Sequence, residues 1–112
     1  IPVSDTMTYY NLYVNVRNTT DYPFQNLYLF IDIAAPNGAI ARDTFECYLA
    51  DDHGKWLGKG RGKYRDNRFT YRQNVRFGAE GEYRITLQQA MRVEQLKGIS
   101  EIGFRVELGS NK

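Results

Sequence analysis

The chain has 112 residues, of which 42% are apolar and 25% charged, so it is long enough for one folded domain and too apolar for a disordered segment. Its formal net charge of +2 is too small to indicate a nucleic-acid partner or a membrane surface, and no run approaches the roughly 20 apolar residues that cross a bilayer. The sequence opens at Ile1 without an initiator Met or a signal peptide, so we expect a processed or trimmed chain whose residues 1–112 form a single domain.

Apolar and polar residues alternate with a period of two along most of the chain, a pattern that predicts half-buried β-strands. The first alternating run covers residues 10–17, and the second covers residues 26–34. Pro36-Asn37-Gly38 then predicts a hairpin turn, because Asn-Gly tolerates the positive φ angles of a type I′ turn. The returning run extends from residue 39 to about residue 49, where Asp51-Asp52-His53-Gly54 makes the next turn.

Alternating runs continue through the second half of the chain. Residues 55–63 carry Gly at every second position over part of their length, which is typical of a bulged edge or of closely approaching backbones. Clearer strands follow at 69–77 and 82–89, and a last strand precedes the C-terminus. About seven short strands without a long helical pattern predict an all-β fold, a single antiparallel, jelly-roll-like β-sandwich with one short helical turn near residues 90–97.

One face of each run is apolar and predicts the core. The residues that we expect there are Leu12, Val14, Val16, Leu29, Ile31, Tyr83, Ile85, Leu87, Phe104 and Val106. The single cysteine, Cys47, alternates with Phe45 and Leu49 and is expected to be a small buried side chain. A nucleophilic cysteine would need a base, and the single histidine, His53, sits in a turn.

Basic residues gather in residues 55–76, which hold eight of the fifteen Lys and Arg residues and one acid, Asp66. The strand period places Arg68, Arg72 and Arg76 on one face. Such a strip suits an acidic partner protein or an anionic surface, and the alternative is a solvated face paired across the sheet with Glu and Asp. The candidate partner-binding basic strip is formed by Arg68, Arg72, Arg76, Lys59, Arg61 and Lys63. The charge is too low to predict nucleic-acid binding.

Two further features compete with this interpretation. Asp51-Asp52-His53 brings two carboxylates and an imidazole together, but their spacing fits neither a calcium loop nor a zinc site. Trp56 and Tyr64 suggest a platform on which sugar rings stack, so a carbohydrate-binding module is the second functional class; alternatively, Trp56 caps the end of the sandwich, with its indole N–H reaching a carbonyl. The sequence lacks a nucleophile elbow, a paired-carboxylate site and a phosphate loop, so we expect no enzyme and no cofactor.

Six segments of the chain stand out together: Val16-Arg-Asn18, Tyr22-Pro-Phe-Gln-Asn-Leu27, Pro36-Asn-Gly38, Leu57-Gly-Lys-Gly60, Gln88-Gln-Ala-Met-Arg92 and Gly98-Ile-Ser-Glu-Ile-Gly-Phe-Arg-Val-Glu107. In this order they resemble the gliding-motility lipoprotein H (GldH) family. The resemblance covers about residues 9–108, and the last two segments are its more distinctive parts.

The resemblance implies a non-enzymatic lipoprotein of the Gram-negative cell envelope that faces the periplasm. It implies a lipid bilayer anchor through an acylated N-terminal cysteine that is not present in this chain, since Cys47 lies in the middle of an expected strand. It also implies partners among the envelope proteins of the gliding-motility apparatus and the type IX secretion system. No residue-level functional site follows from it.

Overall fold

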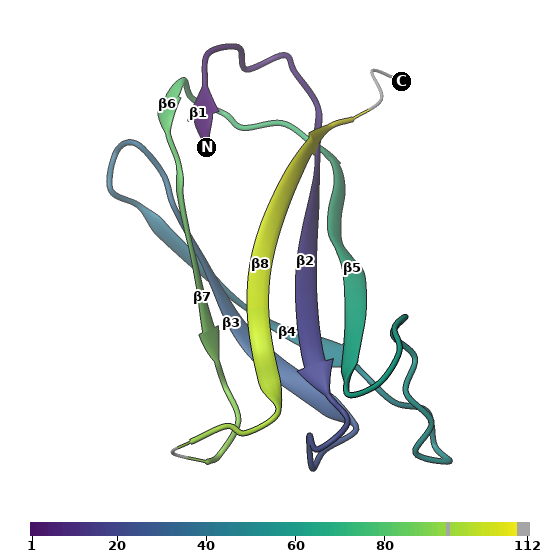
Figure 1. The fold of residues 1–112 in the computed structure, drawn as a ribbon. Coiled ribbons are helices and arrows are strands. Elements are labelled where there is room, and N and C mark those ends of the chain that lie inside the picture. The colour runs from purple at the N-terminus through teal and green to yellow at the C-terminus, as the bar shows by residue number, and fades with distance from the viewer. Residues whose placement is uncertain (94, 110–112) are drawn as a thin grey trace.

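The alternating runs form two three-stranded antiparallel sheets, which the computed structural model describes over residues 1–93 and 95–109 (Figure 1). In the first sheet, β2 (Tyr10–Thr19) lies between β5 (Tyr64–Val75) and β8 (Ile99–Leu108). In the second sheet, β3 (Asn26–Ala34) lies between β4 (Ile40–Tyr48) and β7 (Arg84–Gln89).

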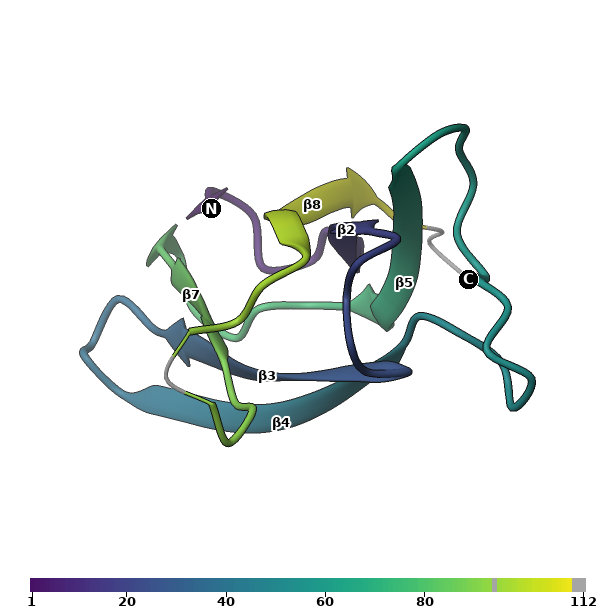
Figure 2. The ribbon, with the colours of Figure 1, turned by 60° about the horizontal axis from the view of Figure 1, so that its bottom comes forward.

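Two short strands, β1 (Pro2–Val3) and β6 (Gly81–Glu82), pair with each other at the N-terminal end of β7. Figure 2 shows the two larger sheets as separate layers, with the strands of one crossing those of the other. The prediction of an all-β antiparallel sandwich is therefore confirmed.

The helical turn expected near residues 90–97 does not form in the described part of that range. Residues 90–93 and 95–97 make bends and turns, because the first of them continue the sheet. The N–H of Ala90 donates to the carbonyl of Tyr28 at 2.7 Å, and the sulfur of Met91 lies 3.3 Å from the N–H of Tyr28. Ala90 and Met91 are thus held beside β3 instead of starting a helical turn.

The hairpin predicted at Pro36-Asn37-Gly38 is present, but it is not a type I′ turn. A bond from the N–H of Ala35 to the carbonyl of Ala39 closes a three-residue loop, and only Gly38 within it has a positive φ, of 90°. A three-residue hairpin loop needs just one left-handed residue, at its last position, so Asn37 keeps an ordinary conformation.

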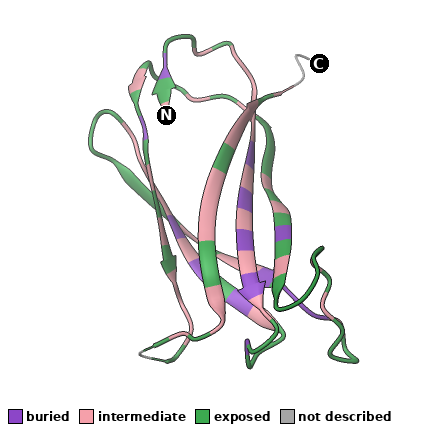
Figure 3. Cartoon of the chain, viewed as in Figure 1, coloured by how far each residue is buried: buried purple, intermediate pink, exposed green. Residues whose placement is uncertain are grey.

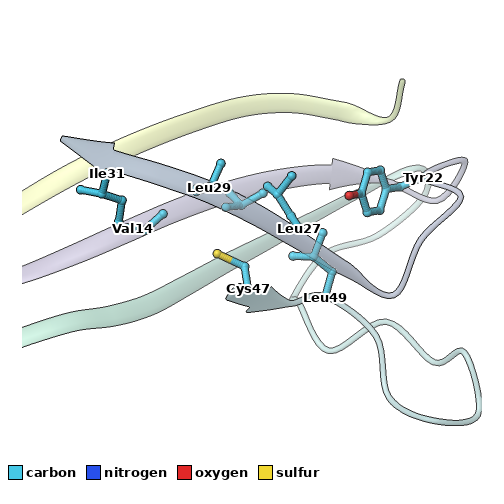
Figure 4. Close-up of a cluster of buried hydrophobic side chains, with 8 residues drawn as sticks. Val14, Tyr22, Leu27, Leu29, Ile31, Cys47 and Leu49 are labelled. Atoms are coloured by element: carbon cyan, nitrogen blue, oxygen red, sulfur yellow. The ribbon is translucent and has the colours of Figure 1, made fainter. Parts of the chain in front are cut away.

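The centre of the core lies between β2 and β3, the central strands of the two sheets (Figures 3 and 4). Their inward side chains have relative exposures of 2% or less: Leu12, Val14, Val16, Leu27, Leu29 and Ile31. Tyr83 and Cys47 are also buried as predicted. The other four predicted core residues lie on edge strands and are half-buried: Ile85, Leu87, Phe104 and Val106. An edge strand has a neighbour on one side only, so its inward residues keep some contact with water.

We predict that Leu29→Ala lowers the free energy of unfolding by about 2–5 kcal/mol, because it leaves a cavity between the sheets. Urea denaturation measures the loss. Thr86→Ala on the exposed face of β7 is the control and should stay within about 0.5 kcal/mol of the wild type. Equal losses at the two positions would contradict the assignment of the core.

Candidate functional site, a groove beside the edge of β5

The loop that joins β4 to β5, residues 49–63, begins with a turn built on one carboxylate. Asp51 accepts hydrogen bonds from the N–H groups of His53 and Lys55, both at 2.9 Å. Gly54, with φ of 80°, donates its N–H to the carbonyl of Asp51. The Asp-Asp-His-Gly segment is thus turn chemistry, and in the described residues no cluster of three His, Cys, Asp or Glu side chains forms.

The far end of this loop is held against β5 by a buried polar pair. The side-chain amide of Asn67 donates to the side-chain oxygen of Asn18 at 2.9 Å and to the carbonyl of Val16 at 3.1 Å. Gly58 passes so close that an added Cβ would lie 2.7 Å from the side-chain oxygen of Asn67. Lys59 and Asp66 then exchange two backbone hydrogen bonds, of 2.7 and 2.9 Å. The close approach predicted from the glycines is therefore confirmed, although this segment is not a strand.

An open groove of about 940 Å³ lies where this loop meets β5, β2 and β8. Its apolar lining includes Tyr48 and Leu57, whose relative exposures of 58% and 55% are high for side chains of their size, together with Phe69. Its polar lining includes an ion pair between Arg17 and Asp66, at 2.7 Å.

Arg17 and Lys59 both line the groove, and Arg17 is the one of the two that pairs with an acid of the groove. Asp66, and more weakly Glu101, raise the pKa of the Arg17 guanidinium. Lys59 lines the same groove and makes no ion pair with an acid of residues 1–93 and 95–109. The groove therefore combines exposed apolar surface with a cation that is available to a ligand.

The predicted basic strip is divided into separate parts by the backbone of β5. The register between β2 and β5 shifts between Leu12 and Tyr13, and beyond the shift Asn74 has φ of 52°. A bulge of this kind re-aims side chains, so Arg72 no longer shares a face with Arg68. The expectation that three arginines line one strand face is wrong for Arg72.

Each of the three arginines has its own partners. Arg68 donates to Glu107 at 2.9 Å and lies 3.8 Å from the ring centroid of Tyr13. Arg72 donates to Asp43 of the other sheet at 2.9 Å. Arg76 lies over the ring of Tyr9 at 5.1 Å, with the sulfur of Met7 at 3.8 Å. Arg105 and Arg68 together lower the pKa of Glu107, Arg105 contributing more.

The three cations of the strip that lie in the loop of residues 49–63 differ from Arg68 and Arg72 in lacking acidic partners among the described residues. Lys59, Arg61 and Lys63 are all exposed, and none of them forms an ion pair with an acid in the part of the chain that the structure describes. Lys63 makes a cation–π contact of 5.8 Å with the ring of Tyr64. Their charge is therefore directed at solvent or at a ligand.

The two aromatic residues of the predicted sugar platform have unequal surroundings. Trp56 is half-buried, pairs with Ala50 and packs against the hydrophobic core, as expected for a residue that caps the sandwich. No hydrogen bond joins its indole N–H to a carbonyl of the described residues, so that part of the expectation is wrong. Tyr64 is 45% exposed, but Arg17 and Lys63 lie against its ring. Only one ring of the pair is thus exposed.

The contact of Asp43 with Tyr71 and Arg72, here called the clamp, joins the two sheets and was not predicted from the sequence. Asp43 of β4 accepts hydrogen bonds from the hydroxyl of Tyr71 and from Arg72 of β5, each at 2.9 Å. Burial, and next the hydrogen bond to Asp43, raise the pKa of Tyr71 to about 12, so its hydroxyl stays a donor. No spacing in the sequence relates residues 43 and 71, because the contact depends on how two edge strands face each other.

Together these features define a class of protein, a β-sandwich with an open groove where the loop of residues 49–63 meets β5. A comparison with known protein families assigns the chain to one of them. The sequence profile of the GldH lipoprotein family matches residues 1–106, and the chain belongs to that family. The resemblance predicted from sequence motifs is thereby confirmed.

Two similar proteins support the assignment. The gliding motility lipoprotein GldH homolog of Christiangramia forsetii is 37% identical over 114 residues, which cover 96% of this chain and 70% of that protein. The gliding motility lipoprotein GldH of Flavobacterium johnsoniae has the same identity and coverage. No solved structure matches the chain. The part of the chain that the structure describes contains no helix with the length and hydropathy of a membrane span.

We predict that Gly58→Ala destabilises the protein by roughly 1–3 kcal/mol, because the new methyl group meets Asn67 and the Asp66 carbonyl. Thermal or urea unfolding measures the effect. The control is Gly103→Ala, on the floor of the same groove, where an added Cβ meets no atom within 4 Å. If both variants were as stable as the wild type, the loop would not be fixed against β5.

We also predict that Cys47 resists alkylation by iodoacetamide at mildly alkaline pH. Burial, with a smaller contribution from Glu46, raises its pKa to about 12, so the reactive thiolate is scarce and inaccessible. Mass spectrometry should show modification only after urea is added. Rapid alkylation of the folded protein would contradict a purely structural thiol.

Proposed function

We propose that this protein is a non-catalytic, membrane-anchored lipoprotein of the cell envelope that takes part in gliding motility and the type IX secretion coupled to it. Membership of the GldH lipoprotein family carries this proposal. A family of lipoproteins implies attachment by a covalent lipid, and we place the domain on the periplasmic side. Cys47 does not serve as the anchor, because its side chain is wholly buried in β4.

We further propose that the domain acts by binding acidic partner proteins of the motility or secretion apparatus. The observation that supports this is the groove with its exposed apolar residues beside loop cations that form no ion pair within residues 1–93 and 95–109, a combination suited to an acidic protein. Within the predicted strip, Lys59, Arg61 and Lys63 provide the contact. Arg68 and Arg72 are already paired and contribute less, because a new partner must displace an existing acid.

The cellular role is tested by deleting the gene in its native organism. We expect loss of surface spreading or of type IX-secreted proteins from the medium, with rescue by the wild-type gene. Normal spreading and secretion in the deletion strain would overturn the motility proposal.

We predict that the triple variant Lys59→Glu/Arg61→Glu/Lys63→Glu folds but loses most of its capture of partners from envelope extracts. Exposed charges add little to stability, so circular dichroism should be unchanged. Added salt should weaken capture by the wild type.

The matched control reverses three other exposed cations without an acid partner in the described residues, Arg84, Arg92 and Lys97. It changes the net charge by the same amount and should retain capture. If the loop variant captured as well as this control, the partner surface would lie elsewhere.

A further inference from the structure

The two open sides of the sandwich differ in how they are protected. On the side formed by β4 and β5, the clamp of Asp43 with Tyr71 and Arg72 ties the sheets together. Phe45 adds ring contacts with Phe69 and Tyr71, at 6.4 and 5.4 Å. The Lys59–Asp66 bridge and the bulge also interrupt the edge of β5, and an inward charge and a bulge are devices that exclude an added strand.

The side formed by β7 and β8 has no such protection among the described residues. These strands belong to different sheets, and the register of β7 against β3 runs without a shift. The inward residues of β7, Ile85 and Leu87, are apolar and half-buried. β8 brings Ile102 and Phe104 to the same side, also half-buried. The edge of β7 is therefore suited to receive another strand.

The hydrogen-bond pattern between β3 and β7 determines which backbone groups of β7 are free. The N–H of Ala90 donates to Tyr28, and hydrogen-bonded pairs alternate along an antiparallel ladder. The register therefore directs the N–H and C=O groups of Arg84, Thr86 and Gln88 toward β3. The same groups of Ile85 and Leu87 point to the opposite side, where no described strand is hydrogen-bonded to β7.

The first residues of the chain already occupy the start of this edge. Ile1 and Tyr83 exchange two backbone hydrogen bonds, of 2.7 and 2.9 Å, and β1 continues the ladder on β6. The line of β1, followed backwards from Ile1, runs along Ile85 and Leu87. The side chains of Ile1 and Val3 are largely buried, at 12% and 3% exposure, so this ladder packs against the core.

We propose that the free edge of β7 binds the tether, the polypeptide that joins the acylated cysteine to Ile1, as an added antiparallel strand. This inference rests on the membrane anchoring proposed above. Each residue upstream of Ile1 advances one residue along β7, so the second and fourth upstream residues face Ile85 and Leu87. Residues directly opposite each other share a face, and these two positions should be apolar to cover the half-buried side chains.

A docked tether sets the orientation of the domain. It runs antiparallel to β7, so it arrives from the end of the sandwich at which β7 ends and the loop of residues 49–63 lies, the lower end in Figure 1. The groove and its loop cations then face the membrane. A free tether would instead suspend the domain from Ile1, with the groove pointing away.

Amide hydrogen exchange, measured by NMR, tests the proposal on the acylated protein in detergent micelles and on residues 1–112 alone. The N–H groups of Ile85 and Leu87 should exchange at least about tenfold more slowly in the acylated protein. Arg84, Thr86 and Gln88 are the internal controls, because their N–H groups bond to β3 in both forms and should be slow in both.

Equal exchange of Ile85 and Leu87 in the two forms would overturn the proposal. Protection that grows with protein concentration would also overturn it, because the occupant would then be a second copy of the chain. These outcomes are separate from the function proposed above. If the protein carries no lipid, or its deletion leaves motility and secretion intact, that function fails whatever the exchange rates of β7.

Discussion

The packing of β2 against β3 is the contact on which the rest of this structure depends. Each is the central strand of its sheet, and their inward Leu, Val and Ile side chains are almost completely removed from water. Complete burial of one such side chain contributes about 1.5–3 kcal/mol. The edge strands add less, because their inward residues stay half-buried, so the sandwich is stable at its centre and accessible at its margins.

Polar interactions are placed at those margins and set the position of the loops and edges. The amide of Asn67 donates to the side-chain oxygen of Asn18 where the loop before β5 meets the sheet, and Asp43 joins the two sheets at their open side. An unpaired amide or carboxylate at such positions would cost free energy, so each contact selects one arrangement of the backbone around it. The exposed cations of the loop are left out of this network, and for that reason their charge remains available.

The sequence predicted the fold well because alternation directly reports which face of a strand is buried. Leu12, Val14 and Val16 show this, and so does Cys47, which is as inaccessible as its pattern indicated. The site was less predictable. A period of two placed Arg68, Arg72 and Arg76 on one face, but it assumes a regular strand, and the bulge in β5 breaks that assumption. The groove also joins Tyr48, Leu57 and Glu101, which come from three distant segments, so no local pattern could relate them.

The unequal protection of the two open sides also limits how copies of this domain associate. Growth of a fibre by edge-to-edge pairing needs two adhesive edges on every molecule, so that each added copy offers a new one. Here the clamp and the bulge interrupt the β4–β5 side, and among the described residues neither device is present on the β7–β8 side. Two copies that met through this side would close on each other and offer no further edge. Misassembly through the β7–β8 side therefore ends at a dimer.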